Sequence, residues 1–276
     1  MIEIKLNKFS ISNSLPFVLI AGPCVLENEK KTLFIAEEIN KICNELNINY
    51  IFKSSFDKAN RTSIKSERGF NLKDSLKIFE KIKKEFECPI ITDVHNEEQC
   101  NILAGNKIID VIQIPAFLCR QTDLLISAGK TNKIINVKKG QFLAPNDVKN
   151  IFEKINTVNN YNIMVTERGT SFGYNNLVND FRAIDIMKKF KYPVIFDGTH
   201  SVQQPGGLGD KSGGKREFIP SLCKAAVSIG VAGVFLETHN DPDNAPSDGP
   251  NMVVLNDLKK ILIELKDFDL IAKKNA

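Results

Sequence analysis

The chain has 276 residues, of which 42% are hydrophobic and 25% are charged, and its formal net charge is +4. This average composition excludes disordered and fibrous proteins, and the small net charge excludes a protein whose whole surface binds nucleic acid or an anionic membrane. The length exceeds the usual single core of roughly 100 to 200 residues but suits α/β barrels, which run to about 250 residues as one domain.

The N-terminal residues, IEIKLNKFSIS, alternate apolar and polar side chains with a period of two. This pattern predicts a small β-hairpin within residues 1–14. We expect it to precede a barrel and to cover the bottom of that barrel.

Eight short apolar runs, rich in Ile, Val and Phe, follow along the chain. They are FVLIAG (17–22), NYIFKS (49–54), PIITDV (89–94), DVIQIP (110–115), KIINVK (133–138), NIMVTE (162–167), PVIFDG (193–198) and GVFLET (233–238). Continuous apolar runs are typical of strands that are buried on both faces in a parallel sheet. Eight such strands indicate a (β/α)8 barrel.

Amphipathic stretches between the runs predict helices. In residues 72–86, apolar side chains recur every three or four residues, and residues 216–230 show the same spacing and end at Gly230, a residue typical of helix C-termini. Strand and helix therefore alternate, and no linker interrupts them. We predict a single α/β domain over residues 1–276, a (β/α)8 TIM barrel with an N-terminal β-hairpin.

Polar side chains of functional type stand at or just after the end of every predicted strand. They are Cys24; Lys53; Asp93 and His95; Gln113; Lys138; Glu167 and Arg168; Asp197 and His200; Glu237 and His239. The active sites of TIM barrels form where the strands end, at the C-terminal face. Any one of these residues could be a surface residue, but all eight strand ends together predict an active site.

Several cations belong to this predicted site: Lys53, Lys58, Arg61, Lys138 and Arg168. Arginine binds phosphate and carboxylate through two parallel hydrogen bonds, and lysine supplies a compact charge. The pattern predicts a substrate with two or three anionic groups. A single lysine in so lysine-rich a chain is more often an ordinary solvated residue, but Lys53 and Lys138 directly follow apolar strand runs.

A second group, Cys24, His200, Glu237 and Asp248, has the ligand types of Zn²⁺, Fe²⁺ or Mn²⁺. Their spacing forms no local motif. A lone buried cysteine is more often a core residue, and His200 alone is equally compatible with a general base or a structural role. The glycine-rich segment 204–218 lacks the P-loop pattern and suggests a closing lid, with a surface loop as the alternative.

The chain resembles the 3-deoxy-D-manno-octulosonate 8-phosphate synthase (2-dehydro-3-deoxyphosphooctonate aldolase) family, in motifs that span nearly its whole length in the right order. These are AGPCVLE (21–27), FKSSFDKANRTS (52–63), TDVH (92–95), IPAFLCRQTDL (114–124), NVKKGQF (136–142), ERGTSFGYNNLV (167–178), FDGTHSVQQPGG (196–207), SGGKREFIP (212–220) and ETHNDPDNAPSD (237–248). The resemblance implies a homotetrameric barrel transferase that condenses phosphoenolpyruvate with D-arabinose 5-phosphate for lipopolysaccharide inner-core biosynthesis.

The resemblance also assigns residues to the two substrates. The phosphoenolpyruvate site would consist of Lys53, Lys58, Gln113, Ala116, Lys138 and Arg168. The arabinose 5-phosphate site would consist of Asn60, Arg61, Thr62 and Ser63, with Arg120 reaching in from a neighbouring subunit. Many relatives carry Ser where Thr62 stands, which preserves the hydroxyl group.

The family has a metal-dependent and a metal-independent branch, which carry Cys and Asn respectively at the position of Cys24. The resemblance therefore implies the metal-dependent branch, with Cys24, His200, Glu237 and Asp248 as ligands of a divalent Zn, Fe, Mn or Co ion. Asp93, His95 and His200 are the candidates for proton transfer.

Three other functions compete with this one. The related synthase that uses erythrose 4-phosphate typically has Pro where Asn60 stands. A Schiff-base aldolase would use Lys138 as its nucleophile. A barrel retained as a non-catalytic binding protein would tolerate loss of the site cations, which are all present.

The sequence also predicts where the protein resides. The N-terminus lacks the apolar run of a signal peptide, and no apolar stretch reaches the ~20 residues that span a bilayer. The six cysteines show no CxxC spacing. We expect a soluble cytoplasmic enzyme that binds neither nucleic acid nor membranes.

Overall fold

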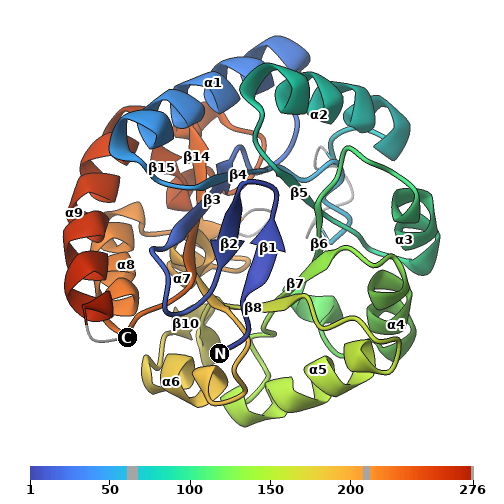
Figure 1. Ribbon diagram of the computed structural model, residues 1–276. Coiled ribbons are helices and arrows are strands. Elements are labelled where there is room, and N and C mark those ends of the chain that lie inside the picture. Colours follow the sequence, from blue (N-terminus) through green and yellow to red (C-terminus); the bar gives the residue numbers. More distant parts are fainter. Residues whose placement is uncertain (61–67, 208–211, 275–276) are drawn as a thin grey trace.

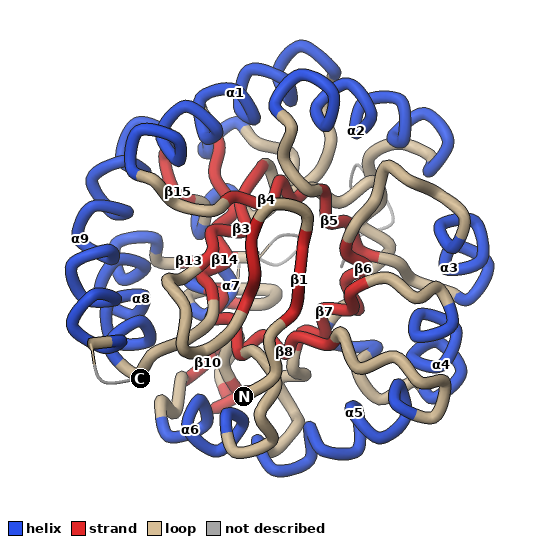
Figure 2. The backbone as a smooth tube through the Cα atoms, in the orientation of Figure 1, coloured by secondary structure: helices blue, strands red, loops and turns tan. Residues whose placement is uncertain are grey.

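The computed structural model describes residues 1–60, 68–207 and 212–274. Its centre is a closed barrel of parallel strands, ringed by helices (Figures 1 and 2). In the order of pairing, the barrel strands within these residues are β3 (Val18–Gly22), β4 (Tyr50–Lys53), β5 (Ile90–Asp93), β6 (Val111–Ile114), β7 (Ile134–Lys138), β8 (Ile163–Glu167), β11 (Val194–Asp197) and β14 (Gly233–His239). Pairing of β14 with both β11 and β3 closes the barrel. The predicted TIM barrel is confirmed.

The strands form because their side chains are buried on both faces. The inward side chains fill the barrel, and the outward side chains pack under the helices in a larger apolar core. Every residue of β3, β7, β8 and β14 is buried. This two-sided burial is the reason that the runs are continuously apolar rather than alternating.

The outer ring consists of α1 (Glu29–Leu46), α2 (Leu72–Phe86), α3 (Glu97–Ala104), α4 (Thr122–Lys130), α5 (Val148–Asn156), α6 (Arg182–Lys188), α8 (Ile219–Ser228) and α9 (Leu255–Lys273). Helix α2 has the predicted bounds, because the Asn71 side chain accepts a hydrogen bond from the Asp74 backbone N–H and so caps its start. Among the described residues, no helix is long and apolar enough to cross a membrane.

The predicted helix over residues 216–230 begins later than expected. Residues Arg216–Phe218 form a 3-10 turn, η3, and α8 starts at Ile219 with Pro220 in its first turn, a position that favours helix initiation. The helix ends at Ser228, and Gly230 follows with a φ of +82°, a conformation that glycine adopts readily.

The N-terminal hairpin pairs β1 (Ile4–Leu6) with β2 (Phe9–Ile11) and lies across one end of the barrel (Figures 1 and 2). Ile4, Leu6 and Ile11 are buried in one apolar cluster with lumen residues that include Val18 and Val111, the first residues of β3 and β6. The predicted hairpin is confirmed. It closes the N-terminal end, so the pocket of the barrel opens at the opposite face.

Short elements surround that opposite face. They are the hairpin of β9 (Thr170–Gly173) and β10 (Asn176–Val178), the ribbon of β12 (Gln203–Gln204) and β13 (Gly213–Gly214), the strand β15 (Val253–Val254), the short helix α7 (Gly198–Ser201), and the 3-10 turns η1 (Ala116–Leu118), η2 (Pro145–Asp147), η4 (Pro242–Asn244) and η5 (Gly249–Asn251). They carry several of the side chains that line the pocket.

Candidate active site at the C-terminal face

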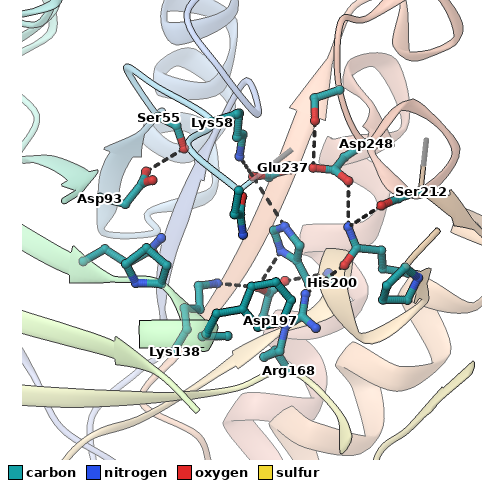
Figure 3. A pocket seen from close by; sticks show the side chains of 18 of the residues that line it. Ser55, Lys58, Asp93, Lys138, Arg168, Asp197, His200, Ser212, Glu237 and Asp248 are labelled. Carbon is teal, nitrogen blue, oxygen red and sulfur yellow. Dashed lines mark hydrogen bonds and ion pairs between the residues drawn. The ribbon is translucent and has the colours of Figure 1, made fainter. Parts of the chain in front are cut away.

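A cavity of about 200 Å³ opens at the C-terminal ends of the strands (Figure 3). It is lined by side chains from most of the strand ends, as a TIM barrel requires of an active site. The sequence-predicted residues that line it are Lys53, Lys58, Asn60, Asp93, His95, Gln113, Ala116, Lys138, Arg168, His200, Glu237 and Asp248. These side chains therefore lie around one cavity at the mouth of the barrel.

Three of the proposed metal ligands form a compact cluster: ligand atoms of Cys24, Glu237 and Asp248 lie within 4.8 Å of one another. The Cys24 thiol donates a hydrogen bond of 3.1 Å to Asp248 Oδ2. The chain just before Cys24 lies very close to β4 at Gly22. A Cβ atom on Gly22 would overlap the Lys53 carbonyl oxygen, so this close approach needs glycine. His200 is not part of this cluster but lies beside it, with Nε2 3.8 Å from Glu237 Oε1.

Asp197 orients the imidazole of His200. Its Oδ2 lies 2.7 Å from His200 Nδ1, and its Oδ1 accepts the His200 backbone N–H at the start of α7. Burial raises the pKa of the Asp197 carboxyl, but the charges of His200 and Lys138 outweigh burial and hold that pKa well below its usual range. Because Asp197 is ionised, Nδ1 carries the proton and Nε2 faces Glu237, the arrangement of a carboxylate-oriented metal-binding histidine.

The donor set fits a divalent cation. Both carboxylate oxygens of the buried Glu237 lack a hydrogen-bond partner, although Lys58 Nζ lies 3.6 Å from Oε1. Burial, together with the negative charge of Glu237, raises the pKa of the Cys24 thiol well above its usual value. A bound cation would supply the missing partner of Glu237 and favour the thiolate, and one sulfur, one nitrogen and carboxylate oxygens suit first-row transition metals.

Lys53 and Asp93 form a buried network next to Glu237, whose Oε1 lies 4.0 Å from Lys53 Nζ. Lys53 Nζ donates to Ser55 Oγ at 3.1 Å, Ser55 Oγ donates to Asp93 Oδ1 at 2.5 Å, and Lys53 Nζ lies 3.5 Å from Asp93 Oδ1. Burial raises the pKa of Asp93, but the charge of Lys53 and the contact with His95 outweigh burial and hold it well below the usual range. His95 Nε2 lies 3.1 Å from Asp93 Oδ2. The network therefore holds the Lys53 ammonium rigidly at the pocket wall.

Lys138 projects from the end of β7 into the centre of the pocket. It forms an ion pair with Asp197, and its Nζ lies 3.1 Å from the centroid of the Phe235 ring. Burial lowers the pKa of Lys138 to about 8, although the charge of Asp197 opposes this shift. Below that pH the side chain is a cation.

Arg168 completes the cationic wall. It is buried, its Nη2 donates to Gln203 Oε1 at 2.9 Å, and its Nη1 has no partner among the described residues. Its backbone is held by Glu167, whose Oε1 accepts the N–H groups of Arg168 and Gly169. An unpartnered guanidinium nitrogen at a pocket wall is a donor for a bound anion.

Comparisons with known proteins show which family the chain resembles. Residues 1–274 match the DAHP synthetase I family. The 2-dehydro-3-deoxyphosphooctonate aldolase of Rickettsia canadensis (strain McKiel) is 56% identical over 271 residues, which cover 98% of each chain. Proteins of the same name from Bartonella henselae and Rickettsia prowazekii (strain Madrid E) are 55% and 56% identical over 98% of this chain, and the matches cover 96% and 98% of their own lengths.

The chain belongs to the 2-dehydro-3-deoxyphosphooctonate aldolase family. Identity of this order over nearly the whole length of both chains leaves the barrel and its C-terminal face in common between the members. The chain is therefore an enzyme of this family.

Some residues that the family resemblance assigned are not brought into this pocket. Arg61, Thr62 and Ser63 lie outside the described residues. Arg120 is exposed and does not line the pocket of its own chain, and Lys154 Nζ donates to its carbonyl oxygen at 2.8 Å. The expected role of Arg120, in a neighbouring subunit, stays a prediction.

The sequence reasoning gave no role to Asp197, Ser55 or Gln203, which line the pocket and connect its charged residues. Asp197 was visible as a strand-end carboxylate. Ser55 and Gln203 are uncharged, and no spacing in the sequence distinguishes them from surface residues.

Proposed function

We propose that this enzyme condenses phosphoenolpyruvate with D-arabinose 5-phosphate and water, to give 3-deoxy-D-manno-octulosonate 8-phosphate and phosphate for lipopolysaccharide inner-core biosynthesis. The observation that most directly supports this reaction is that Lys53, Lys58, Lys138 and Arg168 all line one cavity. Four cations around one cavity suit a substrate with a carboxylate and phosphates. The names of the relatives support the choice of product.

The cations divide into two groups that match the two ends of phosphoenolpyruvate. Lys53 and Lys58 lie on the Glu237 side, where they would hold the carboxylate. Lys138 and Arg168, with Gln113 and the Ala116 backbone, would hold the phosphate. Because these groups are fixed by buried partners before substrate binds, they stabilise transferred charge without reorganisation.

In the proposed reaction, C3 of the enol phosphate attacks the aldehyde carbon of the sugar, and a water molecule adds at C2. A C–C bond and a C–O bond form, the aldehyde oxygen takes a proton, and the water loses one. The resulting hemiketal phosphate collapses when the bond from C2 to the phosphate oxygen breaks and the C2 hydroxyl group gives up its proton, which releases inorganic phosphate and leaves the ketone. Asp93, His95 and His200 line the same cavity and are the candidate proton carriers.

The same proposal includes a divalent Zn, Fe, Mn or Co ion held by Cys24, His200, Glu237 and Asp248. When bound, such an ion supplies Lewis-acid polarisation and lowers the pKa of water. Asp197 keeps His200 Nε2 free for this role, and the unpartnered oxygens of Glu237 are its most direct support.

We infer that the enzyme works as a homotetramer in the cytoplasm. The β9–β10 hairpin exposes Phe172 by 76% and Tyr174 by 98%, and exposed aromatic side chains are typical of interaction surfaces. The six cysteines are buried free thiols, as expected in a reducing compartment. Arg120, exposed and outside its own pocket, is available to a neighbouring site.

A steady-state assay of phosphate release tests the proposal. We expect D-arabinose 5-phosphate to be used at least about 10-fold better than erythrose 4-phosphate, as kcat/KM, because Asn60 and its neighbours are expected to position the longer sugar. Equal or reversed preference would assign the enzyme to aromatic biosynthesis. If neither sugar leads to phosphate release, the proposed reaction is wrong and the alternative of a non-catalytic binding protein is favoured.

A further inference from the structure

Gln203 stands between Arg168 and Asp248, which share no hydrogen bond or ion pair with each other within the described residues. Its side-chain Oε1 accepts a hydrogen bond of 2.9 Å from Arg168 Nη2. Its Nε2 donates a hydrogen bond of 2.8 Å to Asp248 Oδ1 and lies 3.3 Å from Ser212 Oγ. One amide thus contacts an anion-binding cation and a candidate metal ligand, and Figure 3 shows that Arg168 and Asp248 lie apart from each other.

The chemistry of the amide determines its orientation. A guanidinium group has only donors, and a carboxylate has only acceptors. The opposite orientation would turn the NH2 group toward Arg168 and the carbonyl oxygen toward Asp248, and both contacts would be repulsive. A primary amide is therefore suited to link these two charged groups, because its oxygen can accept a hydrogen bond from Arg168 while its NH2 group donates one to Asp248.

The backbone of Gln203 is fixed against the segment that carries Asp248. Gln203 pairs with Gly214 in the β12–β13 ribbon, and Gly214 packs so closely on Asn251 of η5 that a Cβ atom there would lie 2.5 Å from the Asn251 Cβ. Asp248 precedes η5 and has a φ of +53°. The ribbon and the Asp248 turn therefore form one unit, and the Gln203 amide extends that unit to Arg168.

We propose that Gln203 is a positioning residue that links Arg168, one of the anion-binding cations, to Asp248, one of the candidate metal ligands, by holding the guanidinium and the carboxylate in fixed orientations. This inference rests on the proposed function, because it assigns phosphoenolpyruvate to Arg168 and a divalent ion to Asp248. Binding of phosphoenolpyruvate and binding of the ion would then both depend in part on one uncharged side chain.

The Gln203→Met substitution tests this role. Methionine keeps the length of the side chain but removes both hydrogen bonds, which leaves Arg168 and Asp248 without their shared partner. Partners that orient metal ligands contribute about 10- to 100-fold to metal affinity. A hydrogen bond to a charged group contributes about 10-fold or more. We expect losses of this size for Mn²⁺ and for phosphoenolpyruvate respectively.

Gln204→Met is the matched control. Gln204 is the next residue of the same strand, but its Nε2 donates to Asn176 Oδ1 at 2.9 Å, and it does not line the pocket. The same chemical change is therefore made one residue away with no contact to Arg168 or Asp248. Gln203→Leu is measured in parallel, so that a folding defect specific to methionine does not decide the outcome.

Two titrations give the answer without turnover. Mn²⁺ affinity is measured by the loss of the free-ion electron paramagnetic resonance signal, and phosphoenolpyruvate affinity by calorimetry on metal-free protein. Weaker binding of both in the Gln203 variants, with neither changed in Gln204→Met, supports the link. If either affinity stays within about 2-fold of wild type, or if Gln204→Met loses both as well, the link is wrong.

The same samples separate this inference from the proposed function. If wild type binds Mn²⁺ and phosphoenolpyruvate but releases no phosphate with arabinose 5-phosphate, the proposed reaction fails, and the link is still judged by the two affinities. If wild type binds neither probe, both proposals fall. If wild type catalyses the reaction and the Gln203 variants bind like wild type, only the link is rejected.

Discussion

Ionisable side chains pack against one another in the pocket, so the charge of each depends on its neighbours. Lys138 illustrates this dependence. Asp197 is shared between Lys138 and His200, and burial prevails over the attraction of Asp197 in lowering the pKa of Lys138 to about 8. The Lys138 cation is therefore present in neutral solution and disappears in mildly alkaline solution.

This pKa predicts the alkaline limb of the pH profile. Below about pH 8 Lys138 is an ammonium that attracts the substrate phosphate, and above it the neutral amine loses that attraction. We expect kcat/KM for phosphoenolpyruvate to fall as the pH rises above about 8. In Lys138→Arg the guanidinium stays charged, so the limb should move to higher pH, at a lower overall rate. An identical limb in both proteins would assign the titration to another group.

The ion pair with Asp197 also opposes a Schiff-base role for Lys138, because the nucleophile must be a free amine. We expect borohydride to trap no adduct between the enzyme and its substrates near neutral pH. A covalent adduct found by mass spectrometry, and absent in Lys138→Arg, would instead identify Lys138 as a nucleophile.

Cys24 leads to a prediction about the metal. Removing its sulfur in Cys24→Ala should weaken retention of the divalent ion by about 100-fold or more and reduce kcat, because a lost ligand costs at least as much as a lost partner of a ligand. Cys43→Ala is the control, since Cys43 is a buried cysteine of α1 that lies near the Cys88 thiol and is not one of the candidate ligands. Metal content after dialysis against a chelator is the measurement. Full activity of wild type after verified metal removal would contradict metal dependence.

At the scale of elements, helix α9 packs on its neighbours through buried leucines and also contacts the barrel through one buried carboxylate. Asp269 Oδ2 accepts the Phe17 backbone N–H at 3.0 Å, and Oδ1 lies 2.6 Å from Lys273 Nζ. Lys273 in turn donates to the Val231 carbonyl oxygen at 2.9 Å. The helix thus satisfies backbone groups just before β3 and β14, at the end of the barrel opposite the pocket.

Asp269→Ala should therefore lower the free energy of unfolding by roughly 2 to 4 kcal/mol, because it leaves a buried N–H group without an acceptor and removes the counter-ion of the Lys273 ammonium. Asp267→Ala, at an exposed aspartate of the same helix, should change it by less than about 0.5 kcal/mol. Urea denaturation measures both. The kcat of the folded Asp269→Ala protein should match wild type, and equal stability of the two variants would show that the contact contributes nothing.

At the scale of the whole molecule, the pocket of one chain lacks the Arg120 that the family resemblance assigns to it. If Arg120 acts on a neighbouring subunit, Arg120→Ala and Lys138→Ala disable different parts of each site. Mixed tetramers of the two variants should then recover part of the activity, because some sites combine an intact Lys138 with an intact partner Arg120.

The mixed assemblies are prepared by co-expression with two affinity tags, and native mass spectrometry verifies their composition. Recovered phosphate release relative to either parent is the expected result. Verified mixed tetramers that are no more active than the parents would show that Arg120 does not act between subunits.

The barrel and much of its pocket follow from the sequence by itself. Two-sided burial makes each strand a continuous apolar run, and parallel strands all end at one face, so that Lys53, Lys138 and Glu237 gather although they lie far apart in the chain. The N-terminal hairpin could likewise be predicted from the sequence, because its apolar side chains recur every two residues. Helix starts were less certain, as the 3-10 turn before α8 demonstrates.

Only the tertiary structure decided how the charged groups are paired. Asp197 meets Lys138 across 59 positions of the chain, Gln203 meets Asp248 across 45, and Asp269 meets Phe17 across 252. Hydrogen bonds have a short range and strict geometry, so their partners depend on side-chain directions that no local period encodes. Local pattern therefore determines which residues reach the C-terminal face, and packing determines which of them touch.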